Sequence, residues 1–289
     1  LPISIERRNE RSRVVSMDRP ILGSGGYSIH RDGVSMVQFL EKNGINYDQE
    51  SDLNIDRYPS ILKDYNELIL SGHAEYMTRR IFNSIIAARN NRVNLAIFGG
   101  NTALWQTRLT ESPIGQDRRI IMYRYANEDP VTNLDQVTIE FRDKRLNIPQ
   151  TLFTGSQTTG VHVYGKYQAT QIPKWLRIPK NSSIDGISPD SEVEASFESS
   201  KASPPNVHIL FSGKMSYADP STTPKSMSKH PIAEVIWFTN PNGQATFNAG
   251  LTTWSCNLVD TCAYSSVDEK SRKILDEVTK EVEIGRAHV

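Results

Sequence analysis

The stretch Glu67–Asn101, ELILSGHAEYMTRRIFNSIIAARNNRVNLAIFGGN, decides the fold. It begins with a short apolar run, Glu67–Leu70, that is typical of a buried strand. Thr78 can cap a helix that extends to about Asn90, and its bulky apolar side chains recur four residues apart, so they share one face. A second apolar run, Val93–Phe98, follows. A strand, a helix and a strand in roughly 30 residues predict a βαβ unit with parallel strands and a right-handed crossover.

Two polar loops follow the predicted strands. Ser71–Tyr76, SGHAEY, carries an imidazole, a carboxylate and a phenol, and Gly99–Thr102 is a loop of small residues. In open parallel sheets, ligands bind beyond the carboxyl ends of the strands, so we expect both loops on one edge of the sheet. The start of the helix would favour anions there, such as a carboxylate or a phenolate. Each loop alone also matches an ordinary cap or tight turn.

The segment before this unit contains one expected helix. Residues 1–32 are polar and broken by glycine and proline, and we interpret them as an arm or linker from an upstream region. Asp32 can cap a helix that Asn43-Gly44 ends. Its apolar face consists of Met36, Val37 and Leu40.

Beyond Leu109 the sequence becomes rich in predicted strands. The candidates are Arg119–Tyr125, Gln136–Phe141, Val161–Tyr164, Val207–Phe211, Glu234–Phe238 and Ala245–Asn248. Residues 179–206 are rich in serine and proline and are interpreted as a long loop excursion. A charged helix, Ser265–Glu281, is expected to close the chain. Its apolar positions are Val267, Ile274, Leu275 and Val278. Residues 33–282 are therefore expected to form one α/β domain with a parallel core and additional antiparallel strands.

Composition excludes several classes of partner. Lys+Arg and Asp+Glu both count 33, which gives a net charge of zero and does not indicate a nucleic-acid or anionic-membrane partner. No apolar run approaches the roughly 20 residues of a membrane helix. Cys256 and Cys262 fit no strong metal spacing and predict either two buried thiols or one small disulfide loop. We expect a soluble protein whose compartment stays open, with the cytoplasm favoured.

The two ends of the chain carry no fold information. The chain starts at Leu1, and residues 283–289, EIGRAHV, look like the translation of a sequencing adapter. We therefore expect a fragment with a non-native tail and leave this tail out of the fold prediction.

Three later side chains have an ordinary interpretation as well as a functional one. Tyr123 and Tyr125 would lie on one face of a strand, beside Arg124, and such tyrosines are usually half-buried packing residues. Glu192 lies in Asp190–Glu194, DSEVE, which by itself predicts a solvated acidic loop.

These pieces, taken together and in order, resemble the C-terminal domain of the large (beta) subunit of N,N-dimethylformamidase and its relatives. The matching segments are Phe39–Gly44, Ser71–Tyr76, Leu95–Thr102, Trp105, Met122–Arg124, Asp129-Pro130, Phe247–Gly250 and Trp254-Ser255. Each segment alone is common, whereas the ordered set is fairly specific. The resemblance implies a class I glutamine amidotransferase-like (flavodoxin-like) parallel sheet, which agrees with the βαβ unit.

The resemblance also implies an activity and a metal. N,N-dimethylformamidase hydrolyses a small N,N-dialkyl amide at a mononuclear iron that two tyrosines and one glutamate hold. Matched by motif, these ligands fall on Tyr76, Tyr123 and Glu192. Phenolate and carboxylate oxygens suit ferric iron, and its open positions would take water and the amide oxygen. We therefore expect a ferric iron and a small-molecule amide substrate.

Three further residues are expected to act on the substrate. His73 and Glu75 are the candidates for the general acid that protonates the leaving amine. Asn101 is expected to orient the amide. The resemblance to a subunit implies a small subunit or a homo-oligomer as partner.

The chain departs from the family pattern in its first motif. Ala74 and Met77 stand where the family has Asp and Trp, and Ser191 replaces the aromatic residue before the glutamate. Ala74 removes a carboxylate that would support the site, so dimethylformamide itself is not the expected natural substrate. The alternative is a non-catalytic binding or structural module that keeps the fold with a degenerate metal site. A metal-free hydrolase with a cysteine nucleophile is less favoured, because both cysteines lie late in the chain.

Overall fold

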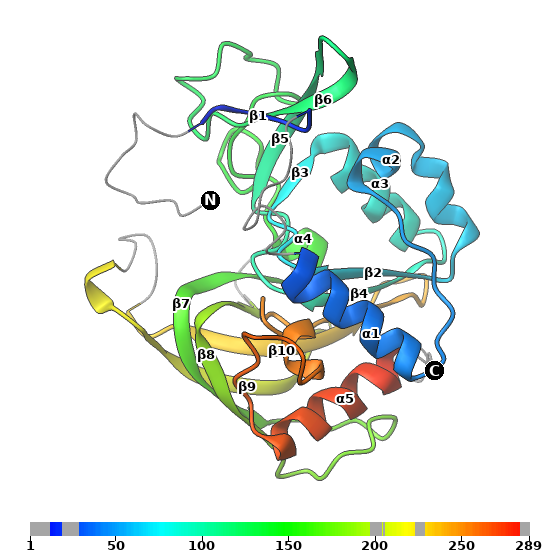
Figure 1. Cartoon of the computed structure of the whole chain (residues 1–289), viewed down its shortest axis with the longest axis vertical. Helices are drawn as coiled ribbons and strands as arrows, with labels where there is room; N and C mark the ends of the chain where they lie inside the picture. Colours follow the sequence, from blue (N-terminus) through cyan, green and yellow to red (C-terminus); the bar gives the residue numbers. More distant parts are fainter. Residues whose placement is uncertain (1–11, 19–28, 197–203, 205, 223–228, 284–289) are drawn as a thin grey trace.

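A computed structural model describes residues 12–18, 29–196, 204, 206–222 and 229–283 (Figure 1). The chain is a mixed α/β protein whose strands form a seven-stranded and a four-stranded sheet. Most of the predicted N-terminal arm and nearly all of the predicted tail lie outside the described residues. None of the helices in these ranges is both long enough and apolar enough to cross a membrane.

The predicted βαβ unit is confirmed. β2 (Glu67–Gly72) and β4 (Asn94–Gly99) pair in parallel, and α3 (Arg79–Arg89) connects them. Thr78 caps α3 as expected, because its Oγ1 accepts a hydrogen bond from the Ile81 N–H at 3.0 Å. The sequence pattern missed one element, the short strand β3 (Tyr76–Thr78), which lies between β2 and α3.

Both faces of β4 are buried, which explains its continuous apolar sequence. Ala96 and Phe98 face a core that α1 (Val34–Lys42) and α5 (Glu269–Glu283) cover. The alternate residues Leu95 and Ile97 face a second core beneath α3. In that core Phe82 stacks on Phe141 and tilts against Phe153, at 4.6 and 5.0 Å between ring centroids. The end of β4 is therefore held from two sides.

The seven-stranded sheet is only partly parallel. Its order is β2-β4-β11-β10-β9-β7-β8. The later strands are β7 (Ser156–Ala169), β8 (Ser183–Ser196), β9 (His208–Tyr217), β10 (Ile232–Thr239) and β11 (Ala245–Asn248). Among the described strands of this sheet, only the β2–β4 and β4–β11 pairs are parallel. The mixed α/β class is thus confirmed, whereas the glutamine amidotransferase-like core stays a prediction.

One loop prediction and two strand predictions need correction. The loop excursion at 179–206 is wrong, because β8 occupies half of it and pairs with β7 through several register shifts. The segment 136–141 is not a strand and makes only an isolated bridge from Glu140 to Trp105. The strand predicted at 119–125 ends at Ile121 as part of β6 (Gly115–Ile121).

The four-stranded sheet lies beside the βαβ unit (Figure 1). Its order is β1-β6-β5-β3, with β1 (Val14–Ser16) and β5 (Trp105–Ser112). β3 pairs in parallel with β5, opposite Trp105–Thr107. The short helices α2 (Asp52–Arg57), η4 (Pro59–Asp64) and α4 (Thr151–Thr154) fill the connections.

Asp32 does not cap α1, contrary to the prediction. A π-helical turn, η3 (Ile29–Gly33), runs directly into α1, and Gly33 keeps helical angles of φ −66° and ψ −50°. An N-cap needs an extended backbone, which is missing here. The Asp32 carboxylate instead accepts hydrogen bonds from the Arg31 guanidinium at 2.7–3.0 Å, and this ion pair is buried.

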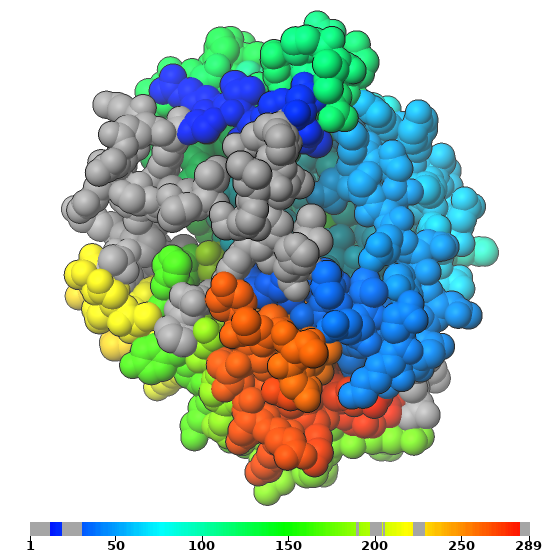
Figure 2. Space-filling view, in the orientation of Figure 1, coloured from blue at the N-terminus to red at the C-terminus, as the bar shows by residue number. Residues whose placement is uncertain are grey.

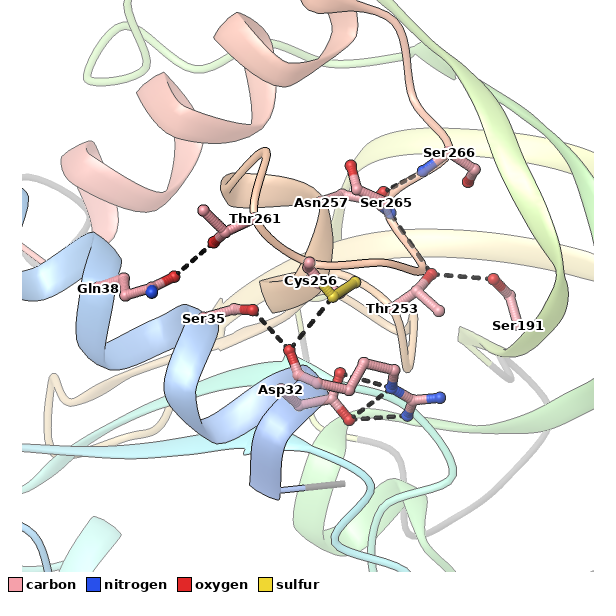
Figure 3. Close-up of a disulfide and its surroundings, with 12 residues drawn as sticks. Asp32, Ser35, Gln38, Ser191, Thr253, Cys256, Asn257, Thr261, Ser265 and Ser266 are labelled. Atoms are coloured by element: carbon pink, nitrogen blue, oxygen red, sulfur yellow. Dashed lines mark hydrogen bonds and ion pairs between the residues drawn. A yellow bond between two sulfur atoms is a disulfide. The ribbon is translucent and has the colours of Figure 1, made fainter. Parts of the chain in front are cut away.

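The two cysteines form a disulfide, with 5.4 Å between the Cα atoms (Figure 3). Cys256 lies in η6 (Ser255–Leu258), the 3₁₀ turn after β11. The Cys262 Sγ lies 3.6 Å from the carbonyl oxygen of Arg31, and Thr261 donates to the Gln38 side chain at 2.9 Å. The disulfide loop therefore packs on η3 and α1, and on the visible face of Figure 2 the orange loop lies beside the blue helix.

Candidate functional site

Four of the six predicted site residues meet around one imidazole nitrogen. The Nε2 atom of His73 lies 3.1 Å from Glu192 Oε2, 3.5 Å from Glu75 Oε2 and 3.3 Å from Asn101 Nδ2. His73 and Glu75 come from the loop after β2, Asn101 from the loop after β4, and Glu192 from β8. As predicted, the loops after β2 and β4 share one edge of the sheet.

Two glycines allow this convergence. A Cβ atom on Gly99 would lie 1.9 Å from the carbonyl oxygen of Gly72, so only glycine lets the ends of β2 and β4 approach this closely. A Cβ atom on Gly100 would lie 2.8 Å from the carbonyl oxygen of Glu192. Gly100 therefore leaves room for β8.

β8 reaches the site because the seven-stranded sheet curls into a half-barrel. β8 lies at one edge of the sheet, yet Val193 bridges Leu251, just after β11 in the middle of the order. The Leu251 N–H donates to the Gly99 carbonyl at 2.8 Å, and the Glu192 N–H donates to Thr252 Oγ1 at 2.9 Å. This chain of contacts fixes Glu192 beside the loop after β4.

The surroundings of His73 favour its protonated form. Burial lowers the pKa of His73, but contact with Glu192 and the charge of Glu75 outweigh burial and raise it overall. For Glu192 burial acts in the opposite direction and raises the pKa, but contact with His73 outweighs burial and holds the pKa below its usual value. Nε2 therefore faces two acceptors and the Asn101 amide donor. The neutral ring can accept from Asn101, and the protonated ring can donate to a carboxylate.

Glu75 and Tyr76 form the opposite wall of the site. Glu75 Oε1 accepts a hydrogen bond from the Trp105 indole at 2.9 Å. Arg124 donates to the Tyr76 hydroxyl at 2.6 Å and lies over the Trp105 ring, 4.9 Å from its centroid. Burial raises the pKa of Glu75 and that of Tyr76, and the charges of Glu75 and Glu192 raise the pKa of Tyr76 further. The negative charges of Glu75 and Glu192 therefore both act on the Tyr76 phenol.

Tyr76 was predicted to lie at the start of the helix. It lies instead in β3, two residues before the cap Thr78. Burial and the charge of Glu75 raise the pKa of its phenol and outweigh the opposing charge of Arg124, so the surroundings favour the neutral phenol over the phenolate that a helix dipole would stabilise.

Tyr123 contacts a different set of side chains. The guanidinium groups of Arg13 and Arg108 lie 5.5 and 5.7 Å from the centroid of its ring. Its neighbour Arg124 adopts a left-handed backbone with φ 71° and extends to Tyr76. The structure thus brings Arg124, rather than Tyr123, into contact with the His73 cluster. The role of Tyr123 as an iron ligand stays a prediction.

Sequence reasoning gave Trp105 and Arg124 no role. Both were visible only as parts of matching segments, because nothing in a single sequence indicates that β5 and the turn after β6 meet at Glu75 and Tyr76. A left-handed conformation at Arg124 is uncommon for a non-glycine residue and often marks a functional position, but it is visible only in the structure.

The oxygen atoms at this site determine which metal could bind. Among the described residues, no three side chains drawn from histidine, cysteine, aspartate and glutamate converge closely enough to hold a metal ion by themselves. A metal here would need a phenol oxygen in addition to carboxylates. Glu192 Oε2 is buried and, within the described chain, accepts no hydrogen bond of good geometry. Its distance to His73 Nε2, 3.1 Å, is that of an ion pair. A buried acceptor of this kind, beside Glu75 and Tyr76, fits a hard cation such as ferric iron.

A family model described as "N,N-dimethylformamidase beta subunit-like, C-terminal" matches residues 4–266. This range includes both polar loops, Arg124 and Glu192. A search of curated proteins gave no match. Because the family model spans most of the sequence, the chain belongs to the family of N,N-dimethylformamidase beta subunit-like C-terminal domains.

Proposed function

We propose that this protein hydrolyses the C–N bond of a small N-substituted amide in an iron-dependent reaction. The family supports this class of activity. The observation that carries it furthest is the position of His73 Nε2, between the carboxylates of Glu75 and Glu192 and next to the Asn101 amide. Such a cluster combines a proton carrier, two carboxylates and a neutral hydrogen-bond donor in a largely buried site.

The proposed iron would be held by oxygen atoms of Tyr76 and Glu192, with Glu75 close enough to contribute. Bound iron would polarise the amide carbonyl and lower the pKa of a bound water. The raised pKa of Tyr76 is compatible with this role. It arises from burial and from neighbouring negative charge, and a bound cation would lower the pKa again by stabilising the phenolate. We propose Tyr123 as the second phenol ligand, a role that its substitution by phenylalanine tests.

The protein side chains would handle the protons and orient the substrate. His73, kept protonated by Glu192 and Glu75, can donate the Nε2 proton to the leaving amine nitrogen. Before this step, Glu75 would accept a proton from the attacking water, and Glu192 would serve as the iron ligand. The Asn101 amide can donate to the substrate carbonyl oxygen, because its own oxygen is already bound by Thr158 at 2.7 Å. Arg124 and Trp105 hold Glu75 and Tyr76 in place.

The family description names a beta subunit, and we therefore propose that the protein works in an assembly with a second kind of subunit or with further copies of itself. Size-exclusion chromatography with light scattering on the purified protein tests this. A strict monomer that is fully active would contradict it.

Amine release from a panel of small formamides and acetamides, with N,N-dimethylformamide as one member, tests the activity. We expect turnover of at least one amide, loss of turnover after treatment with an iron chelator, and its return when iron is added. His73→Gln should abolish turnover, whereas the matched control His208→Gln should not, since His208 stacks on Trp237 in β9 and β10. A folded, iron-loaded protein that hydrolyses none of these amides, or a fully active His73→Gln variant, would contradict the proposal and favour a binding module.

A further inference from the structure

Glu194 is a fully buried carboxylate that is held by neutral donors. Its Oε1 accepts from the Thr102 N–H at 2.8 Å, and its Oε2 accepts from Asn248 Nδ2 at 2.8 Å and from the Ser156 hydroxyl. Within the described part of the chain no Lys, Arg or His forms an ion pair with it, in contrast to Glu192 two residues earlier. A buried carboxylate is costly, so this one has to be explained by what it holds.

Glu194 holds one end of the loop after β4. The Thr102 N–H donates to Glu194, and Gln150 Nε2 donates to the Thr102 carbonyl oxygen at 2.8 Å. The two side chains thus bind both backbone groups of Thr102. The residues on either side, Asn101 and Ala103, both adopt left-handed backbones, with φ 54° and 53°. Such a conformation is costly for non-glycine residues and persists only where the surroundings fix it.

The same network sets the direction of the Asn101 side chain. The Thr158 hydroxyl donates to Asn101 Oδ1 at 2.7 Å. The same hydroxyl accepts from Gln150 Nε2, and the Thr158 N–H donates to Gln150 Oε1, both at 3.3 Å. With Oδ1 occupied, Asn101 Nδ2 is left to face His73. The orientation of Asn101 is therefore determined by buried groups that do not themselves contact His73.

We infer that Glu194 and Gln150 are positioning residues that clamp Thr102 and thereby aim the Asn101 amide into the site. This inference rests on the proposed function, because it assigns the clamp to the reaction of the His73 cluster. The clamp joins β8 and the segment before α4 to the loop after β4, so it also fixes the spacing between Asn101 and Glu192. Neither Glu194 nor Gln150 would touch the substrate.

NMR of the Asn101 side-chain amide tests the inference without any substrate. In protein labelled with ¹⁵N-asparagine, the signals are assigned with Asn101→Ala and then compared in Glu194→Gln and Gln150→Leu. We expect both substitutions to move the Asn101 signals. The matched control is Glu281→Gln, a glutamate that is also buried but lies on α5, and it should leave them in place. Unmoved Asn101 signals in the clamp variants would overturn the inference.

Steady-state kinetics test whether Glu194 and Gln150 matter for catalysis. On an amide that the wild type hydrolyses, we expect Glu194→Gln to lower kcat about 10- to 100-fold with KM unchanged, as is typical for groups that orient catalytic residues. The double variant with Asn101→Ala should be no slower than Asn101→Ala alone, because both changes remove the same function. Additive losses, or loss of thermal stability without loss of kcat, would mark Glu194 as merely structural and overturn the inference.

The two arms also separate this inference from the proposed function. If the wild type hydrolyses no amide, the proposed function fails, while the NMR comparison still decides whether the clamp aims Asn101. If Glu194→Gln does not fold, Gln150→Leu and Thr158→Val carry the same test, since they act on the other side of the loop.

Discussion

The two regions that form the site differ in how they reach it. His73, Glu75 and Asn101 come from the loops of one βαβ unit, whose strands pair in parallel from Glu67 to Gly99. Glu192 and Glu194 come from β8, and Glu194 bonds Thr102 across 92 residues of sequence. The first region depends on local pairing, whereas the second depends on the curl of a whole sheet. The site therefore needs both the parallel pairing of β2 with β4 and the long-range placement of β8.

The largest expected effect comes from removing the charge that β8 contributes. Glu192→Gln should lower amide turnover by about 10²–10⁴-fold, because it removes the partner of His73 and a proposed iron ligand. The thermal midpoint should stay close to that of the wild type. The control Glu234→Gln changes a half-buried glutamate on β10 and should keep activity. Full activity of Glu192→Gln would mean that the βαβ loops suffice for the reaction.

Alanine at the two glycines should break the two regions separately. Gly99→Ala places a Cβ 1.9 Å from the Gly72 carbonyl and should lower the free energy of unfolding by about 3 kcal/mol. Gly100→Ala meets backbone atoms of Glu192 and Thr252 at 2.8 and 2.9 Å, and should cost about 1–2 kcal/mol while displacing β8. Urea unfolding measures both. Gly115→Ala, which meets only the flexible Arg118 side chain, is the control and should cost less than about 0.5 kcal/mol.

The disulfide should stabilise the region after β11 by a smaller amount. A short loop closed between Cys256 and Cys262 is expected to contribute about 2 kcal/mol through the entropy of the unfolded chain. The double variant Cys256→Ala/Cys262→Ala should therefore unfold at lower urea concentration than the wild type under oxidising conditions. The two proteins should converge in the presence of dithiothreitol. A difference that persists after full reduction would assign the stabilisation to packing instead.

The smallest expected effect concerns the turn that carries Arg124. Burial raises the pKa of Asp129, but hydrogen bonds from Arg108, Val131 and Thr138 outweigh it and lower the pKa overall. A pKa that is lower in the folded than in the unfolded state gives stability that is present at neutral pH and is lost as the pH falls through the folded value. Asp129→Asn should therefore cost about 1 kcal/mol at neutral pH, and less in acid. An equal cost at both pH values would show that the charge of Asp129 does not matter.

The part of the fold that could be predicted from sequence is the part with local signals. The βαβ unit, its Thr78 cap and the exact strand Ala245–Asn248 follow from apolar periodicity and cap chemistry. β8 was hidden because its serine- and proline-containing sequence is typical of a loop, and only pairing with β7 makes it a strand. Asp32 was misassigned because a cap and a buried ion pair use the same residue type, and backbone angles decide between them.

The site was predicted to a similar extent and for the same reason. His73, Glu75 and Asn101 could be placed on one sheet edge from the βαβ unit alone, and Glu192 only from its resemblance to a family motif. Glu194 received no role, although it lies in the same acidic segment, because its function depends on contacts with Thr102, Ser156 and Asn248. Such long-range hydrogen bonds leave no local pattern in a sequence.

Iron binding, followed by the visible spectrum, decides whether Tyr76 holds a ferric iron in this site. The wild-type protein, loaded with ferric iron, is compared with Tyr76→Phe and with the control Tyr47→Phe. The hydroxyl of Tyr47 bonds Glu41 on the surface. We expect about one iron per chain and a tyrosinate-to-iron charge-transfer band in the wild type and the control. This band should be lost or strongly weakened in Tyr76→Phe. A folded, colourless protein that rejects iron, or a band that Tyr76→Phe leaves unchanged, would contradict this assignment.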